Sequence, residues 1–123
     1  MTAGEEKTGG ASPRTTRTEI AAGEVTSLVG MVAYQTGAVV SRAIISRTAG
    51  TLTLFAFDEG QSLSEHTAPF DALAYVLDGK AKVMIDGQPA QLSAGEAILM
   101  PANRPHAVQA ISQFKMLLIM IRS

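Results

Sequence analysis

The sequence predicts an all-β fold built from antiparallel strands. From residue 50 onward, turn-forming residues recur at short intervals, and the segments between them are short and rich in β-branched, aromatic and other apolar residues. No segment carries the 3.6-residue periodicity of a long helix, and a short helix within residues 19–35 is the one helical alternative. The turn formers are Gly50, Gly60, Asp78-Gly79, Asp86-Gly87, Gly95 and the proline-bounded loop 101–105.

Seven strands are expected from this pattern. In the segment 81–86 the residues Ala81, Val83 and Ile85 share one face, because successive strand residues point to opposite sides. Two Asp-Gly pairs predict tight turns: the chain is expected to turn at 78–79 and return as the next strand, and 86–87 repeats this chemistry. The expected strands are 39–47, 51–57, 72–77, 81–86, 97–100, 106–111 and 114–121.

The last of these segments, 114–121, is apolar on both faces. A strand of this kind needs cover on both sides. The sequence therefore predicts sheet-on-sheet packing on one face and either a second layer or a subunit interface on the other.

The N-terminal segment has a different composition. Residues 1–24 are dominated by Thr, Gly, Ala and charged residues and offer little to bury, so we expect a mobile arm unless a partner chain holds it. Residues 25–123 then form a single domain, which is the number that 123 residues can build around one core.

Composition excludes several classes of protein. The net charge is -1, so we expect no nucleic-acid partner. The chain has no apolar run of about 20 residues and no apolar signal core in its first ten, so we expect a cytoplasmic protein with no membrane partner. It has no cysteine, so any metal must be bound by histidine and oxygen ligands. The two histidines are His66 and His106.

Two stretches resemble the motifs of the cupin superfamily. Gly60, His66, Ala68, Ala72 and Gly79 have the spacing of the first motif, which in its metal-binding form reads Gly-x5-His-x-His-x3or4-Glu-x6-Gly. The stretch "GQPAQLSAGEAILMPANRPHAV" is similar to the second motif, with a turn glycine, an Ala-Gly pair, a loop between prolines and then a histidine. The resemblance covers about residues 37–121 and implies a small single-domain protein with a double-stranded β-helix, or jelly-roll, barrel.

The same resemblance implies a reduced metal site. Metal-binding cupins use two histidines and a glutamate from the first motif and a histidine from the second; His66 matches the first ligand and His106 the last, whereas Ala68 and Ala72 replace the other two. Asp71 is a substitute carboxylate if the strand has not begun there. The alternatives are a site for a divalent transition metal (Mn, Fe, Ni or Zn), with or without Asp71, and no metal at all.

Two alanines in place of ligands leave a larger and less polar pocket, which suits a small apolar or mixed molecule. We therefore expect a binding protein of unassigned physiological role whose pocket is lined by His66, Ala68, Ala72, Met100 and His106. The alternative is a metal-dependent dioxygenase or an isomerase-like enzyme. A packed barrel with a structural or regulatory role is a third class.

A metal-free reaction would need a different pair of residues. Some cupins, such as sugar-nucleotide epimerases, use a histidine base and a tyrosine acid, which here would be His66 and Tyr75. Strand alternation turns Tyr75 away from the face of Ala72, so this pairing is disfavoured and no catalytic residue is assigned.

A homodimer is expected. Small cupins of this length resemble proteins that pair through edge strands or an N-terminal segment. The sequence offers a physical reason for pairing: the final strand 114–121 is apolar on both faces and needs cover, and the arm 1–24 of a second copy is able to supply it.

Overall fold

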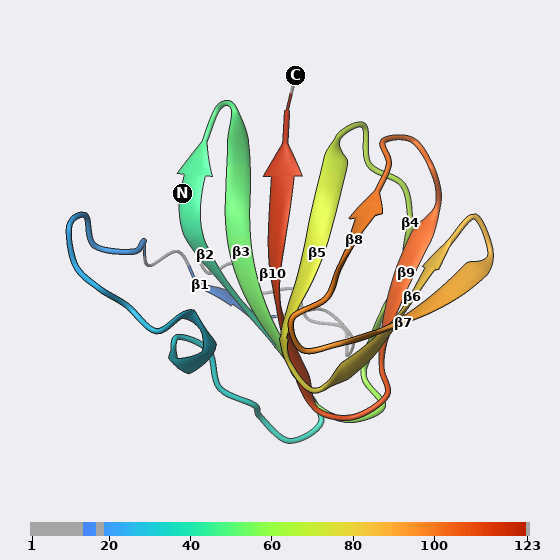
Figure 1. The fold of residues 1–123 in the computed structure, drawn as a ribbon, viewed down its shortest axis with the longest axis horizontal. Helices are drawn as coiled ribbons and strands as arrows, with labels where there is room; N and C mark the ends of the chain where they lie inside the picture. The colour runs from blue at the N-terminus through green and yellow to red at the C-terminus, as the bar shows by residue number, and fades with distance from the viewer. Residues whose placement is uncertain (1–13, 17–18, 123) are drawn as a thin grey trace.

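Short strands make up almost all of the regular structure in the computed structural model, which describes residues 14–16 and 19–122, the first three by their backbone (Figure 1). One turn of 3-10 helix, η1, precedes the second strand. The elements are β1 (Arg14–Thr16), η1 (Leu28–Gly30), β2 (Val39–Arg47), β3 (Gly50–Phe57), β4 (Ser62–His66), β5 (Asp71–Asp78), β6 (Lys80–Ile85), β7 (Gln88–Ser93), β8 (Ala97–Met100), β9 (His106–Ala110) and β10 (Phe114–Ile121).

The strands form two facing sheets. The first has the order β1-β2-β3-β10-β5-β8 and the second the order β4-β9-β6-β7. All pairs are antiparallel except β1 with β2, which is parallel. From β3 to β10 consecutive strands lie in opposite sheets, except for the hairpin pair β6 and β7, in the manner of a jelly roll, so the predicted fold class is confirmed.

All seven expected strands are present, and three further strands were missed: the short β1, β4 and β7. β4 has the sequence SLSEH and β7 the sequence QPAQLS, and both are mostly polar or exposed. They lie at the two edges of the four-stranded sheet, where few side chains reach the interior and the apolar signal is weak. The short helix anticipated within 19–35 is η1.

The prediction that Asp78-Gly79 joins two paired strands in a hairpin is wrong. β5 and β6 belong to different sheets, so the chain bends there and crosses from one sheet to the other. Gly79 has φ +78°, and a Cβ at this position would overlap the carbonyl oxygen of Gln113. The second pair, Asp86-Gly87, does join the hairpin β6–β7, with φ values of 53° and 77°.

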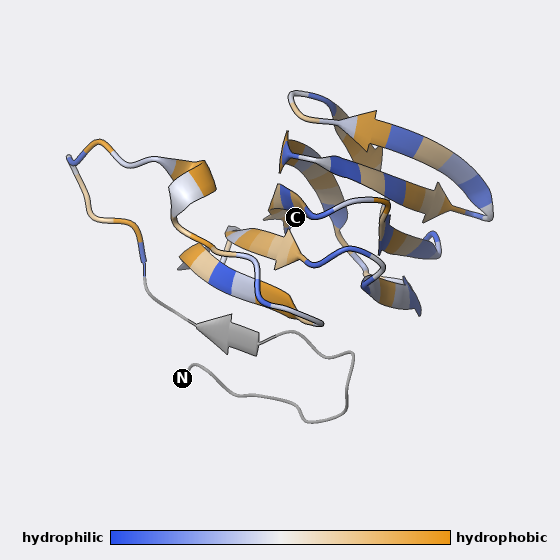
Figure 2. Ribbon diagram, turned by 90° about the horizontal axis from the view of Figure 1, so that it is seen from below, coloured by the Kyte–Doolittle hydropathy of each residue, from blue (hydrophilic) through white to orange (hydrophobic). Residues whose placement is uncertain are grey.

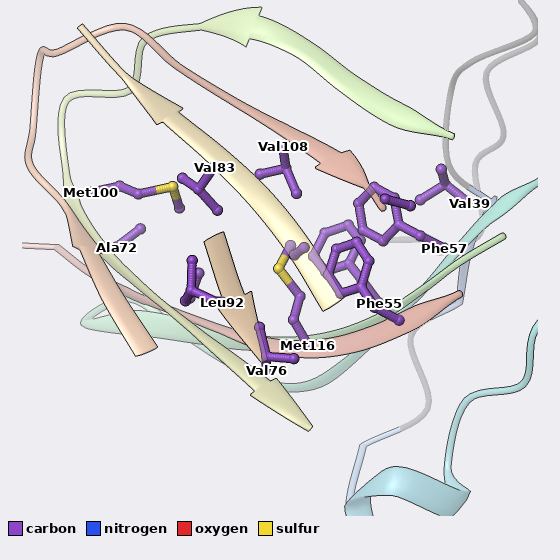
Figure 3. Close-up of a cluster of buried hydrophobic side chains, with 14 residues drawn as sticks. Val39, Phe55, Phe57, Ala72, Val76, Val83, Leu92, Met100, Val108 and Met116 are labelled. Atoms are coloured by element: carbon purple, nitrogen blue, oxygen red, sulfur yellow. The ribbon is translucent and has the colours of Figure 1, made fainter. Parts of the chain in front are cut away.

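The main core lies between the sheets (Figure 3). Phe57 and Phe114 have no exposed surface and stack with their ring centroids 4.4 Å apart. Strands of both sheets contribute alternate residues to this core, and Figure 2 shows the corresponding hydrophobic and hydrophilic bands along several strands. The other fully or nearly fully buried members are Val39, Phe55, Ala72, Ala74, Val76, Ala81, Val83, Leu92, Met100, Val108, Ala110 and Met116.

A second core covers the outer face of the six-stranded sheet. Leu54 and Leu117 point to this side, and Val32, which precedes β2 in the chain, packs on them with Leu28 and Tyr34. The prediction for 114–121 is therefore confirmed: Phe114 and Met116 enter the core between the sheets, and Leu117 enters the outer one. The second layer consists of Ile20 and of residues between 28 and 34 of the same chain.

The predicted arm, residues 1–24, falls largely outside the described part of the chain. Residues 1–13 and 17–18 are not described, and the backbone of 14–16 pairs with 40–42 of β2. Residues 19–24 have no helix or strand. The division into a mobile arm and a domain stays a prediction.

Candidate functional site at the barrel end

The two histidines meet at one end of the barrel. His66 is the last residue of β4, and His106 is the first residue of β9. The two strands are neighbours, and these residues are direct partners in the ladder. The connections that follow β4 and β8 close over the same end of the molecule (Figure 1, top right). The pairing predicted from two distant motifs is thus present in space.

The imidazole rings face each other through their Nε2 atoms, which are 3.1 Å apart. The ring centroids are 4.4 Å apart, and the planes are inclined by 70°. The other nitrogens also have partners: Nδ1 of His66 is 2.9 Å from the carbonyl oxygen of Ser64, and Nδ1 of His106 is 3.2 Å from that of Arg104.

The carbonyl partners of the two Nδ1 atoms favour one tautomer of each ring. A carbonyl oxygen only accepts, so the Nδ1 of each ring carries a hydrogen and donates it. In two neutral rings both Nε2 atoms are then acceptors, and their lone pairs meet. The contact is favourable only when a proton, another donor or a cation lies between the rings.

The two rings lie in different surroundings. His106 is 6 % exposed, whereas His66 is exposed to solvent. Burial lowers the pKa of His106 below its ordinary value of 6.5, and the charge of His66 acts in the same direction, while the hydrogen bond to the Arg104 carbonyl opposes them. Burial therefore favours the neutral form of His106.

Three more residues were predicted to line a pocket here. Ala72 and Met100 are ladder partners on β5 and β8, and they are 4 % and 2 % exposed as members of the packed core (Figure 3). Ala68 is half-buried in the connection between β4 and β5. Ala72 and Met100 are thus part of the packed interior, and the two histidines are the polar members of the predicted set.

Asp71, the carboxylate considered as a further metal ligand, is hydrogen-bonded to backbone in the structure. Its Oδ1 accepts a hydrogen bond of 2.9 Å from the backbone N–H of Ala102. Nearby, the N–H of Asn103 donates to the carbonyl of Ala68 over 2.7 Å. These two bonds join the connection after β4 to the connection after β8. No residue pattern predicts this pairing, because it depends on how two loops far apart in the chain meet.

The donor set does not fit the complete metal site of metal-binding cupins. Within residues 14–16 and 19–122, no group of three or more His, Cys, Asp or Glu side chains is placed to hold a metal ion. The separation of 3.1 Å does suit two cis ligands, which lie about 2.9–3.4 Å apart when each metal–nitrogen bond is about 2.0–2.1 Å. Two of the four ligand positions of metal-binding cupins thus carry histidine here, and the other two carry alanine.

The loop before His106 is held by an ion pair. Both Nε and a terminal nitrogen of Arg104 bind Oδ2 of Asp86 at 2.7 Å, and the carbonyl of Pro105 accepts from the N–H of Asp86 at 2.9 Å. These bonds fix the carbonyl that orients the ring of His106. The proline-bounded loop was visible in the sequence, but its contact with the β6–β7 turn was not.

Tyr75 is not part of this site. Ala72, Ala74 and Val76 face the core, whereas Tyr75 lies on the opposite face of β5 and is 36 % exposed. The histidine–tyrosine pair of a metal-free epimerase is therefore not assembled by these two residues.

Fold and site together define a small jelly-roll protein with paired histidines at one end of the barrel. The sequence matches the family described as "Cupin domain" over residues 53–122, more than half of the chain. The chain belongs to the cupin family.

Three solved structures illustrate the likeness. A conserved protein of unknown function from Streptococcus pyogenes is 32% identical, with a TM-score of 0.81 over 86% of this chain and 93% of its own. A cupin superfamily protein from Desulfitobacterium hafniense is 26% identical, with a TM-score of 0.80 over 86% and 97%. A Cupin 2 conserved barrel domain protein from Leptotrichia buccalis is 42% identical, with a TM-score of 0.74 over 76% of this chain but only 46% of its own.

No match was found among functionally curated proteins. In the part of the chain that the structure describes, no helix is long and apolar enough to cross a membrane.

Proposed function

We propose that this chain is a binding module that holds a small molecule at the barrel end through His66 and His106. The observation that carries the proposal is the 3.1 Å approach of the two Nε2 atoms, each on a ring whose Nδ1 is already bound to a carbonyl. A ligand group that donates a hydrogen bond or carries a proton satisfies both acceptors at once.

The neighbourhood of the pair narrows the class of ligand. Ile85 is the ladder partner of His106 on β6, so it shares the inner face with the two rings. Ala68 replaces a polar ligand on the other side, and the carboxylate of Asp71 is engaged by backbone. The ligand is therefore a small, mostly apolar molecule with one hydroxyl or carboxyl group.

Ligand-observed NMR with a panel of small aliphatic and aromatic alcohols and carboxylic acids tests this proposal. Binding should occur with the wild type and disappear in His66→Ala, whose exposed side chain can be removed without a buried cavity. Gln109→Ala is the matched control, because Gln109 is an exposed residue of the same strand as His106. Binding that survives His66→Ala, or that is absent from the wild type, contradicts the proposal.

A divalent transition metal is the second candidate occupant, and one observation favours it. Histidine ligands of metals donate their other ring N–H to a carbonyl or carboxylate, as both rings do here. Two imidazoles alone make a weak site. Equilibrium dialysis against Mn, Fe, Ni and Zn, followed by elemental analysis, should show metal that is lost in the double variant His66→Ala/His106→Ala. A metal content equal in both proteins contradicts it.

The alternative of a metal-dependent dioxygenase or isomerase-like enzyme gains no support. Such sites use three or more protein ligands, and the described residues supply no third one beside the histidines. The proposal is accordingly one of binding, without a chemical step.

A further inference from the structure

A hollow lies on the outer face of the four-stranded sheet, away from the barrel interior. Its volume is about 280 Å³. On β9, His106 and Val108 are buried, whereas Ala107 and Gln109 point to the outer face. The side chains that line the hollow on this face come from the three neighbouring strands β4, β9 and β6. We call this set the outer hollow: Ser62, Ser64, Lys82, Met84, Ala107 and Gln109.

The strand register brings these side chains together. Ser62 is the ladder partner of Gln109, and Gln109 is in turn the partner of Lys82, so the three form one polar row across the sheet. Met84 and Ala107 are partners in the neighbouring row. A polar row and an apolar row therefore lie side by side in the outer hollow.

A β-bulge in β4 borders the outer hollow. The ladder between β4 and β9 shifts between Leu63 and His66. Ser64 and Glu65 consequently stand opposite the single residue Ala107. A bulge bends its strand and redirects its side chains. The side chain of Ala107 is also short, so the surface is low at this point and the longer side chains of β6 stand around it.

The outer hollow carries one positive charge and no negative one. Lys82 is half-buried, and within residues 14–16 and 19–122 no carboxylate lies within ion-pair distance of its ammonium group. Ser62, Ser64 and Gln109 add neutral hydrogen-bond donors, and their side chains make no hydrogen bond within the same described ranges. The polar groups of the outer hollow are therefore available to an anion.

The charge and the size of the outer hollow narrow the class of ligand. One ammonium group balances one negative charge, whereas a phosphate monoester carries nearly two at pH 7 and the next lysine, Lys80, does not line the hollow. Met84 and Ala107 offer contact to an aliphatic chain. A volume of about 280 Å³ corresponds to about nine water molecules, so the ligand has roughly eight to ten non-hydrogen atoms.

We propose that the outer hollow binds a small aliphatic monocarboxylate, with the carboxylate at Lys82 and Gln109 and the chain along Met84 and Ala107. A charge-assisted hydrogen bond from the ammonium group is about twice as strong as a neutral one, and it orients the ligand. The site is separate from the histidine pair, which lies at the end of the barrel, and it does not depend on the function proposed for that pair.

Hexanoate, a ligand of this size, is the probe. In two-dimensional NMR of the isotope-labelled full chain it should shift the backbone amide signals of residues 62–64, 82–84 and 107–109, with a dissociation constant of about 1–10 mM. Hexan-1-ol and inorganic phosphate should bind at least about 5-fold more weakly, because the alcohol lacks the charge and phosphate lacks the chain.

Two variants test the named contacts. Lys82→Met keeps the length of the side chain and removes its charge, so the dissociation constant for hexanoate should rise about 10-fold. Lys80→Met is the matched control, because Lys80 lies two residues away on the same face of β6 and outside the outer hollow, and its removal should leave binding unchanged. Ala107→Leu should abolish binding by filling the hollow, and the NMR spectrum of this variant reports whether its sheet is intact.

Three results overturn the proposal. The first is the absence of the expected shifts from the wild type, or shifts confined to the residues around His66 and His106. The second is equal weakening of binding by Lys82→Met and Lys80→Met, which would indicate attraction to the overall charge. The third is binding of hexan-1-ol or inorganic phosphate as tight as that of hexanoate.

Discussion

Replacing Gly79 with alanine should destabilise the fold far more than the same change at an open turn. Gly79 has φ +78°, a conformation that costs an L residue about 1–2 kcal/mol. The new Cβ would also overlap the carbonyl oxygen of Gln113 and lie 2.8 Å from Cα of Phe114. Both are backbone atoms that move only with their strand, and overpacking of this kind costs about 1–3 kcal/mol. The expected total is about 3 kcal/mol in the free energy of unfolding.

Two other glycines separate these contributions. Gly87 has φ +77° and nothing within 4 Å of its missing Cβ, so Gly87→Ala should cost only about 1 kcal/mol. Gly50 has no positive φ, but its Cβ would overlap the carbonyl oxygen of Met120. Gly50→Ala should therefore cost about 1–3 kcal/mol through overlap alone.

Urea unfolding followed by far-ultraviolet circular dichroism measures all three variants. With a slope of about 1.5 kcal/mol per molar urea, Gly79→Ala should lower the midpoint by about 2 M. The reasoning is refuted if Gly79→Ala and Gly87→Ala shift the midpoint equally, because the close backbone approach would then have no energetic weight.

Three other changes test the site, a loop and the core. Burial lowers the pKa of His106, so the unfolded chain binds a proton more readily than the folded one, and the free energy of unfolding should fall as the pH drops below about 6.5. The urea midpoint of the wild type should therefore be lower at pH 5.5 than at pH 7.5. This difference should be smaller in His106→Gln. The backbone N–H of Gly37 is the chief cause that lowers the pKa of Asp58, so the contribution of this carboxylate to the free energy of unfolding is present above about pH 3.8 and lost below it. Asp58→Asn should therefore unfold at a lower urea concentration at pH 7. It should also lose less stability than the wild type on acidification. Phe114→Ala removes a side chain with no exposed surface that stacks on Phe57, and it should cost about 3–5 kcal/mol in thermal or urea unfolding.

Each of these has a clear contrary result. Equal midpoints at the two pH values would show that His106 is not held neutral by the fold. An acid limb unchanged in Asp58→Asn would remove this carboxylate from the acid response. A cost below about 1 kcal/mol for Phe114→Ala would mean that the stacked rings do not hold the sheets together.

The residue pattern predicted those strands whose burial is reflected in their own apolar residues. The segment 114–121 was recognised as covered on both sides because every one of its positions except Lys115 is apolar. β4 and β7 were missed since edge strands with solvent on one side need few apolar residues. The hairpin at Asp78-Gly79 was mispredicted because an Asp-Gly pair specifies a bend and not the sheet in which the chain continues.

The site was predictable in position and not in detail. Motif spacing brought His66 and His106 together across 40 residues, and their partnership in the ladder follows from the fold that the motifs imply. The use of Asp71 by Ala102 and the carbonyl partners of both rings were not predictable. Those contacts depend on loop conformations that no residue pattern encodes, and the filling of the barrel by Met100 depends on side-chain rotamers.

The central place of β10 determines how the chain must fold. This strand comes last in chain order, yet it pairs with β3 on one side and β5 on the other, and its residues enter both cores. A growing chain shorter than about 120 residues consequently holds two halves of a sheet with a missing centre and exposed strand edges on both sides. The sheet is completed only when residues 114–121 pair with β3, from Phe114 with Phe57 to Ile121 with Gly50. Because such non-local pairings slow folding, this barrel should fold slowly for its size.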